Sequence, residues 1–287
     1  DKVAGDPSAV LGWAWIQSLL PGDVQGQASV IYGWYTGLVY LTPLLGGLIA
    51  DRFWGQRKTV VFGGILMALG HFVMAFENWF FIALLLLILG NGAFKPNIST
   101  QVGNLYGEDD PRRDGAFTIF YMGINLGAFI CNLVCGTLAA FYGWHYGFGA
   151  AGVGMVVGLV VYLGGQRYLA PDLKMGAKKA RDQEGAAVSE PVKTTPEEWR
   201  RIGALFVLCM LNIVFWAVYE QQGNTMQTWA DEQTVWPSIF GFTIPSTWYQ
   251  SFNPLFIFMF APLLDLFWMR QAKSGKEPSS VAKMAIG

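Results

Sequence analysis

Two charged side chains lie inside long apolar stretches, where they could bind a charged substrate or carry a proton. Lys95 lies between Gly90 and Asn97 with no other charge in that segment, and Glu220 follows an aromatic run that begins at Phe215. A lysine in hydrocarbon costs about 2.5–3.5 kcal/mol, so such residues usually face a cavity or a partner. The alternative is an interfacial position, with Lys95 extending to the cytoplasmic surface and Glu220 lying at the outer surface. The residues by themselves leave both interpretations open.

No set of residues at catalytic or metal-binding spacing accompanies these two charges. The chain has two histidines, His71 and His145, and three cysteines. Cys131 and Cys135 are four positions apart in an apolar run, which favours two small hydrophobic side chains on one helix face over a metal or redox pair. The sequence therefore predicts neither an enzyme nor a metal or cofactor site.

The charge content of the chain is low, and the charge is unevenly distributed. Of the 287 residues, 14% are charged, against roughly 25% in soluble domains, and 53% are hydrophobic. Residues 115–166 contain no Asp, Glu, Lys or Arg. These features exclude intrinsic disorder, a coiled coil and a nucleic-acid-binding surface, and they predict a membrane protein.

Seven segments are long and apolar enough for membrane-spanning helices, which need about 20 residues each. The stretch 171–198, rich in Lys, Glu, Ala and Pro, predicts a cytoplasmic linker. It separates an outer loop (1–28) and a five-span bundle (29–170) from a C-terminal bundle (199–287). The sequence thus predicts an all-α protein with two helical bundles. The seven segments are residues 29–50, 59–76, 79–98, 116–140, 147–168, 202–226 and 249–268, followed by the first turns of another helix at 280–287.

Basic residues alternate between the two sides of this arrangement. Seventeen of the 19 Lys and Arg residues fall in every second loop, whereas the intervening loops at 77–78, 141–146 and 227–248 contain none. Because cytoplasmic loops carry the excess of Lys and Arg, the basic loops are placed in the cytoplasm and residues 1–28 outside it. A chain that begins outside without a signal sequence and ends within a helix is expected to be an internal part of a longer transporter.

Five motifs occur in the order and spacing of one transporter family. Residues 47–58 resemble the loop between helices 2 and 3 of major facilitator superfamily transporters. Residues 90–97, 120–127, 215–223 and 250–254 resemble the helix 4, 5, 7 and 8 motifs of proton-dependent oligopeptide transporters. The resemblance implies the major facilitator fold, with the spans as helices 2–8 and the start of helix 9. Helix 1 with its motif arginine, and helix 10 with its substrate-binding glutamate, are absent from the chain.

The resemblance also implies a function and the residues that carry it. The complete protein would be a proton-coupled symporter of di- and tripeptides in the cytoplasmic (inner) membrane, working by alternating access without a cofactor. Its expected partners are small peptides, protons and membrane lipids, with no nucleic acid and a monomeric state. The peptide-binding residues would be Tyr40, Lys95, Tyr121, Asn125, Trp216 and Asn253, the proton-coupling and gating residues Lys95 and Glu220, and the cytoplasmic latch Asp51, Arg52 and Arg57.

Two other functions fit the same pattern of spans. One is a different facilitator, for nitrate, amino acids or drugs. The other is a seven-helix receptor-type membrane protein with its N-terminus outside. A retinal protein is disfavoured, because it needs a Schiff-base lysine in its last span and residues 249–268 contain none.

Overall fold

The described chain is almost entirely helical, and the predicted all-α class is confirmed. The computed structural model describes residues 7–20, 22–107, 110, 112–170, 172 and 195–286. Two short strands, β1 (Ser238–Ile239) and β2 (Phe242–Thr243), form an antiparallel hairpin. The helices are α1 (Trp13–Leu19), α2 (Val24–Ile49), α3 (Gln56–Met74), α4 (Phe80–Gly103), α5 (Arg112–Tyr142), α6 (Trp144–Gly165), α8 (Pro196–Tyr219), α9 (Thr225–Glu232), α10 (Phe252–Lys273) and α11 (Ser280–Ile286). Short helical turns are η1 (Pro7–Ala9), η2 (Ala50–Trp54), η3 (Glu77–Trp79), η4 (Gln166–Tyr168), η5 (Glu220–Gly223) and η6 (Ser246–Ser251).

Six of the described helical segments are long and apolar enough to cross a membrane, one fewer than the seven predicted. They contain α3, α4, α5, α6, α8 and α10, whereas α2, the remaining predicted span, has 26 residues but is not among them. Tyr32 and Tyr35 of α2 line a cavity, and the half-exposed Tyr40 donates a hydrogen bond to Glu220.

Both α2 and α8 begin earlier than the sequence indicated. The Asp23 carboxylate accepts a hydrogen bond of 2.9 Å from the backbone N–H of Gly26, so α2 starts five residues before the predicted position 29. Thr195 caps α8 through a capping box, so this helix starts inside the predicted linker 171–198. The remainder of that predicted linker lies outside the described residues, except for positions 172 and 195.

A carboxylate outside the membrane-spanning segments stands just before α5. Asp110 accepts hydrogen bonds from the backbone N–H of Arg112 at 2.9 Å and from its guanidinium at 2.8 Å. These bonds lower the pKa of Asp110 to about 2. Asp110 therefore stays charged near neutral pH, where a negative charge is favourable beside a helix N-terminus.

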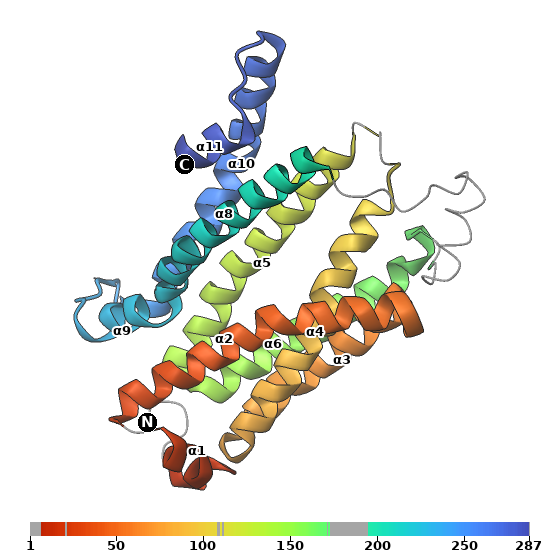
Figure 1. Ribbon diagram of the computed structural model, residues 1–287. Helices are drawn as coiled ribbons and strands as arrows, with labels where there is room; N and C mark the ends of the chain where they lie inside the picture. The colour runs from red at the N-terminus through yellow and green to blue at the C-terminus, as the bar shows by residue number, and fades with distance from the viewer. Residues whose placement is uncertain are drawn as a thin grey trace.

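The helices α2–α6 form one packed group with α4 at its centre (Figure 1). In this group α4 packs against α2 and α3, and α6 packs against α3 and α5. Gly63 and Gly90 let α3 and α4 approach closely, because a Cβ atom at either position would collide with the backbone of the facing helix. Met74, Ala83 and Leu87 form a buried apolar cluster between the same two helices.

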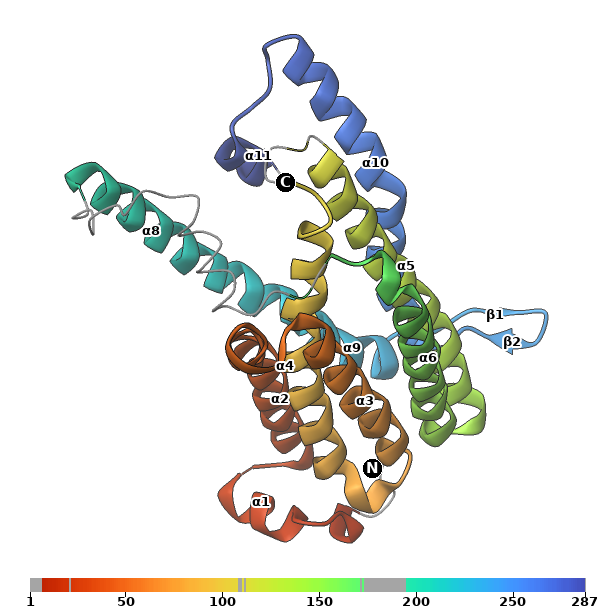
Figure 2. The ribbon, with the colours of Figure 1, turned by 90° about the vertical axis from the view of Figure 1, so that its right-hand side faces the viewer.

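We refer to the later spans, α8 and α10, as the second group; they cover little of the first group and do not pack closely against each other. Of these two, α10 packs against α5. Figure 2 shows α8 extending away from α2–α6. None of the residues in the apolar windows of these two spans is buried. Their lipid-compatible surfaces are therefore open along most of their length in the described part of the chain.

Side-chain hydrogen bonds between the two groups gather at the end that the charge pattern places outside. Two join the start of α2 to η5 and α9, and two join α5 to η6. These four bonds therefore join the two groups at their outer ends. The bonds run from Gln25 to Thr228 (3.3 Å), from Ser29 to Asn224 (3.2 Å), from Trp248 to Thr137 (3.0 Å) and from Ser251 to the carbonyl of Phe129 (3.4 Å).

Candidate functional site

Lys95, Tyr40 and Glu220 form a chain of contacts between three helical segments, α4, α2 and η5. The Lys95 ammonium lies 4.5 Å from the centroid of the Tyr40 ring. The Tyr40 hydroxyl donates a hydrogen bond of 3.1 Å to Glu220 Oε1. A cation over an aromatic face is stabilised by about 0.5–2 kcal/mol, and a hydrogen bond to a charged group contributes roughly 1.5–3 kcal/mol. We refer to these three residues as the Lys95–Tyr40–Glu220 bridge.

The position of Lys95 within α4 is now defined. The helix continues for eight residues beyond Lys95, to Gly103, which is about 12 Å at 1.5 Å per residue. Lys95 is exposed, and its ammonium lies over the half-exposed ring of Tyr40 on the neighbouring helix α2.

An aromatic wall extends the bridge toward α10. The ring centroids of Tyr40 and Trp216 are 6.3 Å apart, and those of Trp216 and Tyr219 are 5.3 Å apart. The Asn253 side-chain amide donates a hydrogen bond of 2.9 Å to the Tyr219 hydroxyl. Tyr219 thus connects Trp216 and Asn253, although sequence reasoning missed it. Its signal was its place directly before Glu220, one helical turn after Trp216.

Tyr121 and Asn125 lie further from the bridge, on α5. Asn125 is buried, and its amide donates a hydrogen bond of 2.8 Å to the Tyr121 carbonyl within the same helix. Tyr121 lines a cavity of about 670 Å³ together with Asn253 and the Phe256 and Phe260 rings of α10. The structure therefore brings Tyr121 and Asn253 to one cavity. Among the described residues, no hydrogen bond or ring contact joins Asn125 to the bridge.

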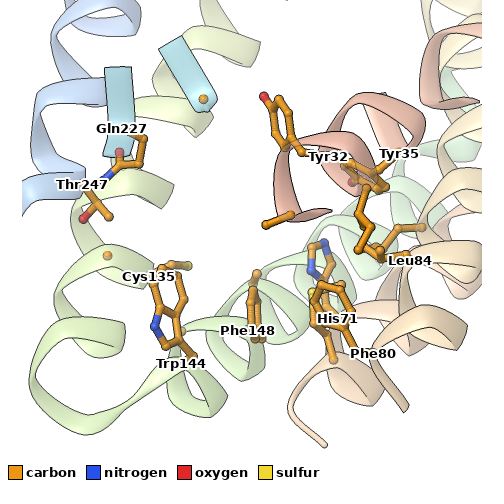
Figure 3. Close-up of a pocket in the computed structure, with 18 of the residues that line it drawn as sticks. Tyr32, Tyr35, His71, Phe80, Leu84, Cys135, Trp144, Phe148, Gln227 and Thr247 are labelled. Carbon is orange, nitrogen blue, oxygen red and sulfur yellow. The ribbon is translucent and has the colours of Figure 1, made fainter. Parts of the chain in front are cut away.

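A larger cavity, of about 760 Å³, contains none of the predicted binding residues. Figure 3 shows rings from α2, α4 and α6 facing one another across it, with His71 of α3 beside them. Its wall is mostly aromatic and aliphatic, and Gln227 and Thr247 are among its few polar groups. Burying a charged group there would lack the partners that such burial requires. The chemistry for a charged substrate lies at the bridge instead.

The predicted latch residues have different surroundings. Asp51 and Arg52 are exposed in η2. The Arg57 guanidinium donates hydrogen bonds to the carbonyls of Leu169 (2.6 Å) and Ala170 (2.7 Å), just after α6 and η4. In this structure Arg57 therefore links α3 to the end of α6, within the group α2–α6.

Asp172 completes this link, and sequence reasoning missed it. Its carboxylate accepts hydrogen bonds from the backbone N–H groups of Gln56 (2.7 Å) and Arg57 (3.1 Å), at the start of α3. The first N–H groups of a helix have no partner inside the helix, so a carboxylate is favourable there. We refer to the contacts of Arg57 and Asp172 as the α3–α6 clasp.

Gly55→Ala is expected to destabilise the α3–α6 clasp. Gly55 has a φ of +80°, and an added Cβ would collide with the Asp172 carboxylate. Alanine should therefore lower the free energy of unfolding by about 1–3 kcal/mol, through strain and a displaced cap. Thermal unfolding of the purified complete protein measures the effect. Gly107→Ala, at a position with open space around it, is the matched control. An unchanged melting temperature for Gly55→Ala would show that the clasp contributes no stability.

The six membrane-capable helical segments define a polytopic membrane protein. The profile of the POT family matches residues 57–178 and 173–287. The chain therefore belongs to the POT family, whose members are transporters of the inner membrane and not enzymes. The predicted family resemblance is confirmed, and family membership removes the receptor-type alternative.

Relatives of known sequence agree with this assignment. The chain is 36% identical to the "Uncharacterized transporter YclF" of Bacillus subtilis, over 93% of the chain and 63% of the relative. It is 34% identical to the "Peptide transporter YePEPT" of Yersinia enterocolitica, over 91% and 62%. It is 33% identical to a "Di-/tripeptide transporter" of Lactococcus lactis, over 93% and 64%. The chain thus spans less than two thirds of the length of these relatives.

Solved structures confirm the major facilitator fold. The structure of a peptide transporter POT in complex with sulfate superposes with a TM-score of 0.71 at 33% identity, over 85% of the chain and 60% of that protein. A mutant of a peptide transporter POT in complex with alafosfalin gives a TM-score of 0.68 at 34% identity, over 84% and 59%. A POT family transporter in complex with a thioalcohol-conjugated peptide gives 0.71 at 30% identity, over 85% and 61%.

Proposed function

We propose that the complete protein carries di- and tripeptides into the cytoplasm together with protons, by alternating access. The observation that carries this proposal is the Lys95–Tyr40–Glu220 bridge. It places one cation and one carboxyl between two groups of membrane-spanning helices. Relatives named as peptide transporters at 33–34% identity support the substrate class.

A small peptide is a zwitterion, and the proposed site offers partners for both of its ends. Lys95 binds the carboxylate, and the side-chain oxygens of Asn125 and Asn253 accept hydrogen bonds from the amino group. Trp216 and Tyr121 pack against peptide side chains without specifying one type. Both asparagine amides already donate hydrogen bonds in this structure, Asn125 to the Tyr121 carbonyl and Asn253 to the Tyr219 hydroxyl. Substrate binding is therefore an exchange of hydrogen bonds as well as a gain of new ones.

The same bridge accounts for coupling to protons. A charged Glu220 accepts the Tyr40 hydrogen bond and draws α2 toward η5. A proton on Glu220 removes that charge and weakens its hydrogen bond to Tyr40; Tyr40, whose ring lies under Lys95, can then move and let Lys95 bind the carboxylate of the peptide. Hydrogen bonds join the outer ends of the two groups, and α8 extends away from α2–α6 (Figure 2). This is the arrangement expected of a carrier that is open to the cytoplasm.

Uptake of labelled dialanine by the complete protein in proteoliposomes tests the proposed function. An inward proton gradient should drive accumulation, and a protonophore should return the internal concentration to that of the medium. Unlabelled dialanine should compete, whereas alanine, nitrate and lipophilic drugs should not. Accumulation that survives collapse of the gradient would contradict proton coupling, and competition by alanine or nitrate would favour the other facilitator functions.

A crosslink across the outer closure is expected to arrest transport. Ser29 and Asn224 touch at 3.2 Å, so cysteines at both positions should react with a short bifunctional reagent in protein freed of its other cysteines. Because the outer end must open in each cycle, dialanine uptake should fall about 5- to 10-fold and recover on cleavage of the reagent. Each single cysteine is the control. Full uptake by the crosslinked protein would contradict alternating access at this closure.

A further inference from the structure

The hairpin between α9 and η6 carries an aromatic residue where its turn favours asparagine or glycine. The strand register pairs Ile239 with Phe242 and leaves Phe240 and Gly241 as a two-residue loop. Their φ values are +51° and +82°, as in a type I′ turn. Bulky side chains are unfavourable at positive φ, and Phe240 is the one non-glycine residue with positive φ in the described part of the chain. The backbone at Phe240 is therefore less favourable than it would be with asparagine or glycine at this position.

The tip of the hairpin is apolar, uncharged and exposed. At the tip Phe240 is fully exposed and Ile239 is 53% exposed; Val235, in the loop before β1, is 96% exposed. No Asp, Glu, Lys or Arg occurs from Gln233 to Leu264. An apolar tip of this kind is unfavourable in water, so it indicates an apolar partner.

The second strand of the hairpin is joined to the outer end of α5 through Phe242, the residue that directly follows the turn. Phe242 stacks on Phe141 with ring centroids 5.2 Å apart, and it lies 5.7 Å from the Trp248 ring. Phe141 belongs to the last turn of α5, and Tyr142 and Trp144 follow it at the outer end. Such aromatic groups mark the membrane–water interface. Figure 2 shows the hairpin projecting sideways from α5 and α6.

We propose that this hairpin is a lipid anchor, with Phe240 inserted into the interfacial region of the outer leaflet. The tip lies at the level of the aromatic belt and points away from the described helices, where lipid surrounds the protein. Aromatic rings are favourable at that depth. A two-stranded tip offers far less than the roughly 800 Å² per partner of a stable protein interface, which argues against a second copy. The anchor holds the loop before α10 at a fixed depth.

Depth-dependent quenching of a fluorophore tests the anchor in the complete protein. Phe240→Cys is labelled with bimane after Cys131, Cys135 and Cys209 are replaced by serine. The labelled protein is placed in phosphatidylcholine vesicles with or without bromine near the headgroup end of the acyl chains. Glu232→Cys, exposed at the end of α9 on the same side, is the matched control. At position 240, brominated lipid should lower the fluorescence about twofold and aqueous iodide should leave it unchanged. At position 232, iodide should lower the fluorescence and brominated lipid should leave it unchanged.

Two results would overturn the anchor. Iodide quenching at position 240 as strong as at position 232 would place the tip in water. Protection from both quenchers would show that protein covers it, either a second copy or a further part of the chain. A second variant isolates the ring. Phe240→Asn suits the turn better and should leave the melting temperature in detergent unchanged or higher, while lipid quenching of a label at Ile239→Cys should be lost. Quenching that persists at position 239 would show that Phe240 is not the anchor.

Discussion

Lys95→Ala is expected to lower proton-driven accumulation of dialanine by about 10- to 100-fold in the complete protein, because an ammonium that meets a carboxylate contributes roughly 1.5–3 kcal/mol. The ammonium lies over the Tyr40 ring, so alanine removes the cation and leaves the Tyr40–Glu220 hydrogen bond possible. Accumulation in proteoliposomes at several dialanine concentrations measures the loss. Lys95→Arg keeps the charge but changes the shape of the cation, so it should retain an intermediate level.

A lysine outside the bridge supplies the control. Lys273 is exposed in the last turn of α10, and Lys273→Ala should leave accumulation unchanged. Wild-type accumulation by Lys95→Ala would show that the ammonium is not needed for transport. The interfacial interpretation of Lys95 would then stand, and the proposed site would lose its cation.

The charges of the candidate site could be predicted from the sequence because they break a strong pattern. Lys95 and Glu220 stand out against apolar surroundings, and the loops around them alternate in basic charge. Hydrophobic periodicity and charge counts are local properties of the sequence, so they can be determined without a structure. The same local signals supported the all-α class and the existence of the spans.

The partners of these charges could not be predicted, because they depend on how distant helices rotate and pack. In the structure Glu220 accepts a hydrogen bond from the Tyr40 hydroxyl, 180 positions away, a pairing that the spacing of the motifs did not indicate. Arg57 was predicted to serve a latch, but its guanidinium binds carbonyls at the end of α6. Spacing along one helix does not determine which neighbour its side chains meet.

The surroundings of α2 also depend on packing. The sequence criterion of about 20 uncharged residues selected this stretch, and it forms a helix of 26 residues, although it is not among the six segments found apolar enough to cross a membrane. Tyr32 and Tyr35 line a cavity, and Tyr40 donates a hydrogen bond to Glu220. Which side chains of an apolar stretch meet a cavity or a distant carboxylate is set by the neighbouring helices, so hydrophobic periodicity alone does not predict it.

Glu220→Gln is expected to separate substrate movement from proton movement. Glutamine keeps the shape of the side chain and an oxygen that accepts the Tyr40 hydrogen bond, but it takes up no proton in the physiological range. Gradient-driven accumulation should fall about 10- to 100-fold, whereas exchange of labelled for unlabelled dialanine at equal pH should persist and lose its dependence on pH. Glu232→Gln, at the exposed end of α9, is the matched control and should behave as wild type.

Tyr40→Phe separates the effect of the Tyr40–Glu220 hydrogen bond from the effect of the Glu220 carboxyl itself. Phenylalanine keeps the ring under Lys95 and removes the donor to Glu220, so coupling should survive while the pH dependence of exchange shifts. Adding Tyr40→Phe to Glu220→Gln should cause no shift in the pH dependence of exchange, because the carboxyl that the hydroxyl serves is already absent. A pH shift that persists in the double variant would show that Tyr40 acts through a group other than Glu220. Retained accumulation by Glu220→Gln would place the proton on another group, and the bridge would then be a structural contact between α2 and η5.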